Sequence, residues 1–193
     1  MKHKITVGWV GAFAALCMAL PGVAQAEMRL SSVAGGAKVS TVLGDNYQNY
    51  SQPLGGQIQF WAENESFLGK SFQLHGSASY VPYGLRGLTD YSLSQWSFLA
   101  GIETGRDHSN WIKPFVSLDI GAVYSRLGVP VNATNVSSLV TNTSTLFAAQ
   151  VCSGVDIPVM GKLGVTIAAP LKVIFSTNKM VSLDGEFSLR WML

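Results

Sequence analysis

The sequence predicts an all-β protein: an eight-stranded antiparallel up-and-down transmembrane β-barrel. Three observations lead to this prediction. Eight segments alternate apolar and polar residues, no charged residue falls on any of the eight apolar sides, and each segment is about the length with which a tilted strand crosses a bilayer. Charged residues also make up only 12% of the 193 residues, against about 25% in soluble proteins. A surface this poor in charge suits lipid better than water.

The first 26 residues are predicted to be a secretory signal peptide. Two lysines precede a long apolar run, which ends at a small-x-small site of the kind that signal peptidase accepts. The residues of this cleavage site are Ala24, Ala26 and Glu27. We therefore expect residues 1–26 to be removed and residues 27–193 to form a single barrel domain. An N-terminal membrane anchor is the alternative, but Pro21 and Gly22 interrupt the apolar run.

The chain that remains is neutral and contains one cysteine. Losing Lys2 and Lys4 reduces the thirteen basic residues to eleven, which equals the number of acidic residues. The basic residues are scattered, so the chain lacks the basic face that nucleic-acid binding requires, and we expect no nucleic-acid partner. Cys152 is the single cysteine after residue 26, so no intramolecular disulfide can form.

The first four predicted strands lie between residues 33 and 103. Residues 33–41 and 57–62 alternate more faintly, with Val33, Ala37, Val39 and Thr41 on one apolar side and Ile58, Phe60 and Ala62 on the other. Residues 72–80 and 95–103 alternate clearly, with aromatic or aliphatic side chains at all but one of the alternate positions and mostly Gln, Ser, His or Glu between them. Strict alternation of this kind indicates a strand with one apolar face and one polar face.

The last four predicted strands are residues 112–124, 147–156, 163–171 and 181–193, and the final one is the clearest. Its apolar side consists of Val181, Leu183, Gly185, Phe187, Leu189, Trp191 and Leu193. Between them come Ser182, Asp184, Glu186, Ser188, Arg190 and Met192. We expect one face of each strand to contact lipid and the other to fill a narrow interior.

Alternation also suits a soluble β-sandwich, in which the apolar sides face inward. The polar sides favour the barrel, because they are rich in Ser, Gly, Ala and Gln, and eight strands leave room only for side chains. The inward charges have both signs, so we predict an ion-pair network that plugs the lumen; a conducting pore is the alternative. These residues are Lys38, Glu103, Lys113, Asp119, Asp156, Asp184, Glu186 and Arg190. Cys152 also faces inward.

Short and long connections alternate along the chain. The short ones are residues 63–70, 105–110 and 158–161; the longer ones are 44–55, 81–93 and 125–144; residues 176–180 break the pattern. Membrane barrels have short turns on one side and long loops on the other. We expect aromatic residues to form a belt at each rim. The outer belt would be Tyr80, Trp96, Tyr124 and Phe147, and the inner belt Phe60, Phe72 and Trp191.

Two prolines conflict with a closed barrel. A proline cannot donate a hydrogen bond to the neighbouring strand. On an edge strand this loss is harmless, but a closed barrel has no edge strand, so a bulge is needed to accommodate the proline. We expect Pro170 to lie at the outer rim and Pro114 near the inner rim.

With these features the chain resembles a known family, the small eight-stranded outer-membrane barrels of the OmpA transmembrane-domain, opacity and attachment-invasion type. Phe115–Tyr124 (FVSLDIGAVY) and Ser153–Pro158 (SGVDIP) look like the Gly-rich strands of that group. The C-terminus resembles its barrel-assembly signal, with Leu in place of the usual terminal Phe. The residues of this signal are Phe187, Leu189, Trp191 and Leu193. The resemblance implies a Gram-negative bacterial outer membrane, with lipid, lipopolysaccharide and the barrel-assembly machinery as partners.

An enzymatic hypothesis rests on His75, Ser77 and Ser79, whose spacing is similar to the His-x-Ser pair of lipid A deacylase barrels. All three residues alternate with Phe72 and Leu74 and therefore lie on the polar side of the strand, which faces the interior and not the acyl chains. We call this odd or even position in a strand a residue's parity, and it makes a hydrogen-bonded lumen histidine the simpler interpretation. His108 and Ser109 lie in a predicted turn. We expect no cofactor and no metal site.

The longest predicted loop, residues 125–144, offers the best indication of function. It contains one charge, several Asn, Ser and Thr, and β-branched residues throughout, so it could extend two strands above the membrane. Such a projection could pair with a host or matrix ligand through its strand edges. The other long loops contribute Tyr47, Tyr50, Tyr83, Tyr91 and Leu85. We therefore expect a non-enzymatic barrel with adhesive or structural loops; the alternatives are a lipid A-modifying enzyme and a narrow channel.

Overall fold

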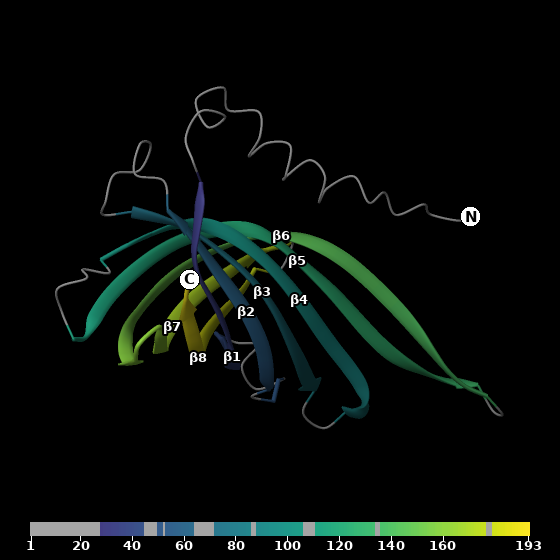
Figure 1. Ribbon diagram of the computed structural model, residues 1–193. Coiled ribbons are helices and arrows are strands. Elements are labelled where there is room, and N and C mark those ends of the chain that lie inside the picture. The colour runs from purple at the N-terminus through teal and green to yellow at the C-terminus, as the bar shows by residue number, and fades with distance from the viewer. Residues whose placement is uncertain are drawn as a thin grey trace.

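The computed structural model contains one closed barrel of eight antiparallel strands (Figure 1). It describes residues 28–44, 50–51, 53–63, 72–85, 88–105, 111–133, 136–176 and 179–193. The strands are β1 (Arg29–Leu43), β2 (Leu54–Glu63), β3 (Phe72–Leu85), β4 (Leu88–Thr104), β5 (Lys113–Ala133), β6 (Val136–Met160), β7 (Leu163–Phe175) and β8 (Met180–Met192). Each strand pairs with its sequence neighbours, and β1 pairs with β8. The predicted fold class is confirmed. The described residues include no helix long and apolar enough to cross a membrane.

The barrel is apolar outside and polar inside. Large apolar side chains cover the exterior, where Phe98 and Leu118 are each 54% exposed. Charged side chains fill the interior, where Lys38 is 2% and Asp119 is 0% exposed. A soluble sandwich has the opposite distribution, so that alternative is excluded. The cleavage residues Ala24, Ala26 and Glu27 lie outside the described residues.

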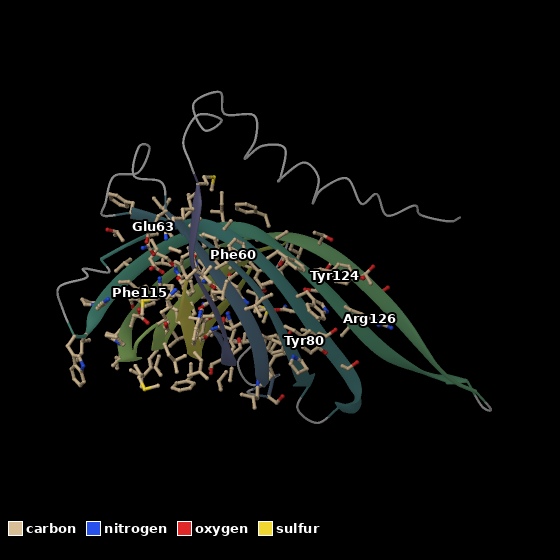
Figure 2. The ribbon with its side chains drawn as sticks, in the orientation of Figure 1. Phe60, Glu63, Tyr80, Phe115, Tyr124 and Arg126 are labelled. Atoms are coloured by element: carbon tan, nitrogen blue, oxygen red, sulfur yellow. The ribbon has the colours of Figure 1, made fainter. Side chains whose placement is uncertain are left out.

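Strand register places the aromatic residues in rows. Tyr80 on β3 is opposite Trp96 on β4, which is opposite Tyr124 on β5, and the Tyr80 and Trp96 ring centroids are 4.7 Å apart. Figure 2 shows Tyr80 and Tyr124 toward the end of the barrel away from Glu63. At the other end, Phe60 and Trp191 are both register partners of Val33. Register therefore aligns Tyr80, Trp96 and Tyr124 in one row and Phe60 and Trp191 in another, whereas Phe147 is opposite Ala122 and Phe72 is opposite Thr104.

The β5–β6 hairpin extends beyond the rest of the barrel (Figure 1). β5 has 21 residues and β6 has 25, whereas β4, the longest of the others, has 17. β4 pairs with β5 only as far as Gly128, and β7 pairs with β6 only from Phe147. Residues 129–133 and 136–140 therefore pair only with each other, and we call the segment 129–140 the ribbon. Residues 125–133 and 136–144 belong to β5 and β6, so the expected extension as two strands is confirmed for these residues.

The ribbon defines the two ends of the barrel. We call the end from which it projects the outer end. The inner end is the opposite one, where β1 begins and β8 ends, because Ser32 is the register partner of Met192. Residues 81–93 were expected to form a long loop at the outer end, but β3 and β4 continue through most of them and pair as far as Leu85 and Leu88.

The expected position of Pro170 at the outer rim is wrong. Pro170 pairs with Cys152 on β6, and β7 continues to Phe175 beyond it. On the β8 side the pairing stops after Ala168 and resumes at Leu171 in an unchanged register, so no bulge is present. Proline has no N–H, so its bond to β8 is lost, while intact ladders before and after hold the register. Pro114 lies one residue from the inner end of β5, as expected.

Candidate functional site

A compact ion-pair cluster lies in the lumen against β1 and β8. Lys38 Nζ is 2.9 Å from both Asp184 Oδ2 and Glu186 Oε1. Lys172 Nζ, from β7, is 3.8 Å from the same Asp184 oxygen. Gln59 Nε2 donates a hydrogen bond of 3.1 Å to Glu186. All of these side chains are buried, so two lysines neutralise two carboxylates in a region that excludes water.

A second cluster lies closer to the inner end and is built around Arg190. Its Nη1 atom is 3.2 Å from Asp156 Oδ2, and its Nε atom donates a hydrogen bond of 2.8 Å to Ser32 Oγ. The guanidinium carbon lies 4.3 Å from the ring centroid of Trp61. Thr166 donates to the other Asp156 oxygen at 3.0 Å. Arg190 is therefore held by a carboxylate, a hydroxyl and an indole ring.

His75 is a lumen residue that pairs with Asp119. Its Nδ1 atom is 2.9 Å from Asp119 Oδ1, and Ser117 donates a 2.8 Å hydrogen bond to the second carboxylate oxygen. The imidazole also lies against Trp61, with ring centroids 5.3 Å apart. Among the described residues, Nε2 is buried without a hydrogen-bond partner. The histidine thus contacts β5 and β2 side chains within the lumen; His108 and Ser109 lie outside the described residues.

The eight predicted lumen charges divide between several environments. Lys38, Asp184 and Glu186 meet in one ion-pair cluster and Asp156 and Arg190 in the other. Asp119 pairs with His75, and Glu103 accepts a 2.9 Å hydrogen bond from Trp61 Nε1. Lys113 lies at the inner mouth.

Two important lumen residues were absent from the predicted set. Lys172 was missed because the predicted strand ended at residue 171, although Lys172 has the same parity as Thr166 and Ala168. Trp61 was missed because it is aromatic on a polar face, although it alternates with Gln57 and Gln59. Parity alone identifies both positions as inward.

Apolar side chains fill the outer end of the lumen, which was expected to hold only small and polar residues. Two groups pack there and share Met180, and we call them together the apolar plug. The plug consists of Val42, Tyr50, Val81, Tyr83, Leu93, Leu99, Val123, Leu146, Ala148, Ile174 and Met180. The expected position of Tyr83 on a loop surface is wrong, because it is 2% exposed. Since Ser40 donates its proton to Asp184, Tyr83 Oη donates to Ser40 at 2.7 Å.

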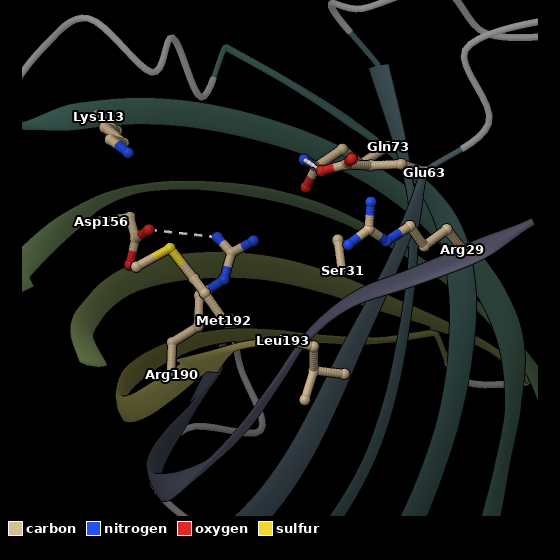
Figure 3. Close-up of a pocket in the computed structure, with 9 residues that line it drawn as sticks. All are labelled: Arg29, Ser31, Glu63, Gln73, Lys113, Asp156, Arg190, Met192 and Leu193. Atoms are coloured by element: carbon tan, nitrogen blue, oxygen red, sulfur yellow. Dashed lines mark hydrogen bonds and ion pairs between the residues drawn. The ribbon is translucent and has the colours of Figure 1, made fainter. Parts of the chain in front are cut away.

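The inner end of the lumen is hollow. A cavity of about 200 Å³ lies there and is drawn in Figure 3. Its lining consists of Arg29, Ser31, Glu63, Gln73, Lys113, Asp156, Arg190, Met192 and Leu193. Arg29 and Lys113 point into it from opposite sides (Figure 3). In the described part of the chain, no group of three or more His, Cys, Asp or Glu side chains is arranged to hold a metal ion.

A closed eight-stranded barrel with an apolar exterior and a charged interior has the architecture of the small outer-membrane barrels. The chain is similar to Neisserial surface protein A (NspA), with a TM-score of 0.65 and 12% identity over 86% of this chain and 99% of that chain. It is also similar to a major outer membrane protein from Thermus thermophilus, with a TM-score of 0.62 and 10% identity over 86% of this chain and 100% of that chain. For Ail, the attachment invasion locus protein of Yersinia pestis, the TM-score is 0.55 and the identity is 14%, over 84% of this chain and 98% of that chain.

These identities show a shared fold alone, and they confirm the predicted resemblance at that level. The structural neighbours are outer-membrane proteins, which supports a membrane barrel. No protein-family model matches the sequence, and no curated protein matches it.

Proposed function

We propose that the protein is a non-enzymatic β-barrel of the bacterial outer membrane whose ribbon binds a ligand outside the cell. The apolar exterior would contact lipid and lipopolysaccharide, and the barrel-assembly machinery would insert the chain. The predicted signal peptide and the outer-membrane neighbours support this location. Because the strand number is even, the inner end faces the periplasm and the ribbon faces outward.

The observation that carries the binding proposal is the pairing of the ribbon. Residues 129–133 and 136–140 pair only with each other, so in the described part of the ribbon both strand edges present backbone N–H and C=O groups that no neighbouring strand satisfies. Residues 129–144 contain no Asp, Glu, Lys or Arg, and Val, Thr, Asn and Ser predominate. Edges without charge are open to strand addition, the mode in which an extended peptide adds to an exposed edge.

The test shortens the ribbon without disturbing the barrel. Gly128 and Thr141 are register partners, so replacing residues 129–140 by Asn-Gly closes the hairpin with a two-residue turn. We expect bacteria that express this variant to lose adhesion to host cells or matrix. A second variant keeps the hairpin and places charges on it, Val131→Lys with Val140→Lys, and we expect the same loss because edge lysines oppose strand addition.

A heat-modifiability gel controls both variants. A closed barrel resists SDS until boiled, so the unheated band should migrate faster than the heated one. Unchanged adhesion by both folded variants would refute the proposed role of the ribbon.

The environment of His75 supports a non-enzymatic barrel over a lipid A-modifying enzyme. Its imidazole lies inside the closed lumen, 2.9 Å from Asp119 and against the Trp61 ring, whereas acyl chains contact the outer surface. Ser77 and Ser79 share its strand, but within the described residues neither is hydrogen-bonded to it.

A further inference from the structure

Arg126 is a charged residue on the outward face of the barrel. It has the same parity as Leu118 and Ile120, which are 54% and 47% exposed on the exterior of β5. Among the outward side chains of β3–β8 that the structure describes, Arg126 is the only charged one. A charge that faces hydrocarbon is costly, and the cost falls toward the membrane surface. The height of Arg126 on the barrel wall therefore decides what it contacts.

Strand register sets this height. Tyr80, Trp96 and Tyr124 form an aromatic row across β3, β4 and β5. Tyrosine and tryptophan rows of this kind lie where the hydrocarbon meets the lipid headgroups. Arg126 is the next outward residue after Tyr124, about 7 Å further along the strand toward the outer end (Figure 2). Its guanidinium therefore lies at the level of the headgroups.

Two hydroxyl side chains flank Arg126 at the same height. Ser94 on β4 and Thr143 on β6 are its register partners, and opposite residues of antiparallel strands have Cβ atoms about 5 Å apart. We call these three residues the Arg126 row. A guanidinium presents a planar set of donors that matches phosphate oxygens, and each hydroxyl adds one donor beside it. The row thus has the donors that a phosphate group requires.

The surface below the aromatic row is apolar. Phe98 on β4, 54% exposed, is opposite Ala78 on β3 and Ala122 on β5. Along one face, the order from the outer end toward the bilayer centre is therefore cation with hydroxyls, aromatic rings, then apolar side chains. A free phosphate ion would use only the first level. A lipid with a phosphorylated headgroup would use all three, with its phosphate uppermost and its acyl chains along Phe98 and Ala122.

We propose that this face of β3–β6 binds the lipid A part of lipopolysaccharide, with a lipid A phosphate on the Arg126 row and acyl chains against the apolar level. The proposal assigns residues to the lipopolysaccharide contact of the proposed function. Occupation of the site in the cell rests on the proposed outer-membrane location. The chemistry of the site does not, because it can be measured on the purified barrel.

The test is native mass spectrometry of the detergent-purified barrel, with lipid A carrying both of its phosphates as the probe. We expect Arg126→Gln to weaken binding about tenfold, the effect of one charge-assisted contact. Arg126→Lys should weaken it less, because the charge remains while the planar set of donors is lost. Arg126 is exposed, so both variants should fold, and heat-modifiability checks this.

Lys162→Gln is the matched control. Lys162 is an exposed cation in the turn between β6 and β7, and its carbonyl accepts a hydrogen bond from Met192 at the inner end. Removing its charge changes the net charge of the protein as Arg126→Gln does, but at the opposite end of the barrel. We expect this variant to bind lipid A as tightly as the unmodified protein.

Two further measurements separate the phosphate from the acyl chains. Ser94→Ala combined with Thr143→Val removes both hydroxyls and should weaken binding of lipid A severalfold. Lipid A from which both phosphates have been removed should bind weakly, and equally to the unmodified protein and to Arg126→Gln. Inorganic phosphate at millimolar concentration should not displace lipid A, because it makes no contact below the Arg126 row.

Three outcomes would overturn the proposal. They are equal binding of lipid A by the unmodified protein and Arg126→Gln, equal binding of phosphorylated and dephosphorylated lipid A by the unmodified protein, and displacement of lipid A by inorganic phosphate. The last would assign the row to a free anion. The variant with the shortened ribbon keeps the Arg126 row and should bind lipid A normally, so failure of adhesion and failure of this site are distinguishable.

Discussion

At the scale of single residues, Trp61 connects the polar groups of the inner half of the lumen. Its ring contacts Arg190 and His75, and its Nε1 atom donates to Glu103. An indole combines a large apolar surface with one donor, so it can fill space and satisfy a buried carboxylate together. A narrow barrel needs side chains of this kind, because polar groups there have little access to water.

Lys38 and Lys172 provide a matched pair for a stability experiment. Lys38 contacts both Asp184 and Glu186 at 2.9 Å, whereas Lys172 lies 3.8 Å from Asp184 alone. Lys38→Met leaves two buried carboxylates with little compensation and should lower the free energy of unfolding by about 3–5 kcal/mol. Lys172→Met should cost less, because Lys38 remains. Urea unfolding in lipid vesicles, followed by tryptophan fluorescence, measures both.

Adding Glu186→Gln to Lys38→Met removes one uncompensated carboxylate, while Asp184 remains to pair with Lys172, so part of the lost stability should be recovered. Equal losses in the two lysine variants, or no recovery in the double variant, would contradict the assignment of Lys38 as the main counter-ion.

At the scale of elements, the β7–β8 ladder has an interruption that a substitution can repair. No pairs form at Ala169 and Pro170, although the register is the same on both sides of them. Pro170→Val supplies an N–H at similar side-chain volume, so we expect one ladder hydrogen bond to form and the free energy of unfolding to rise by about 1 kcal/mol. Hydrogen exchange at Asp184, whose amide faces β7, should slow. Unchanged exchange there would mean that Pro170 does not cause the interruption.

The two ends of β5 and β6 differ in what stabilises them. Near the inner end both strands have neighbours on each side, whereas the ribbon has none. An isolated two-stranded hairpin is only marginally stable in water. A ligand that adds a strand to the ribbon would therefore also order it, which agrees with the proposed mode of binding.

At the scale of the whole molecule, the apolar plug separates the polar lumen from the outer end. Tyr83, Val123 and Ile174 within it are almost completely buried. We therefore expect no discrete conductance steps in planar bilayers, either from the unmodified protein or from Arg190→Ala, because that substitution widens only the inner half. A porin added to the same bilayer is the positive control. Stepwise conductance from the folded protein would show that ions pass the plug.

The number of strands and the faces of their side chains were predictable from sequence. Alternation is a local property, because successive side chains of a strand point to opposite faces wherever the strand lies. Parity therefore identified Asp119, Asp184 and Arg190 as inward residues. The extension of β5 and β6 was also predictable, since β-branched residues continue through residues 125–144.

Two errors show where local patterns stop being sufficient. Pro170 was placed at the outer rim because a proline breaks a ladder, but strong pairing on both sides of it keeps the strand intact. Tyr83 was placed on a loop surface because tyrosine is amphipathic, whereas closure of the barrel brings Val42 and Ser40 against it.

The sequence by itself determined the strand count and the inward and outward faces of the strands. Only the tertiary structure decided which inward residues meet. Lys38 pairs with Glu186 across 148 positions of sequence, and His75 with Asp119 across 44. The reason is physical: strand tilt and register set the height of each side chain, and closure of β1 on β8 brings distant residues to the same level. The apolar plug follows from the same closure.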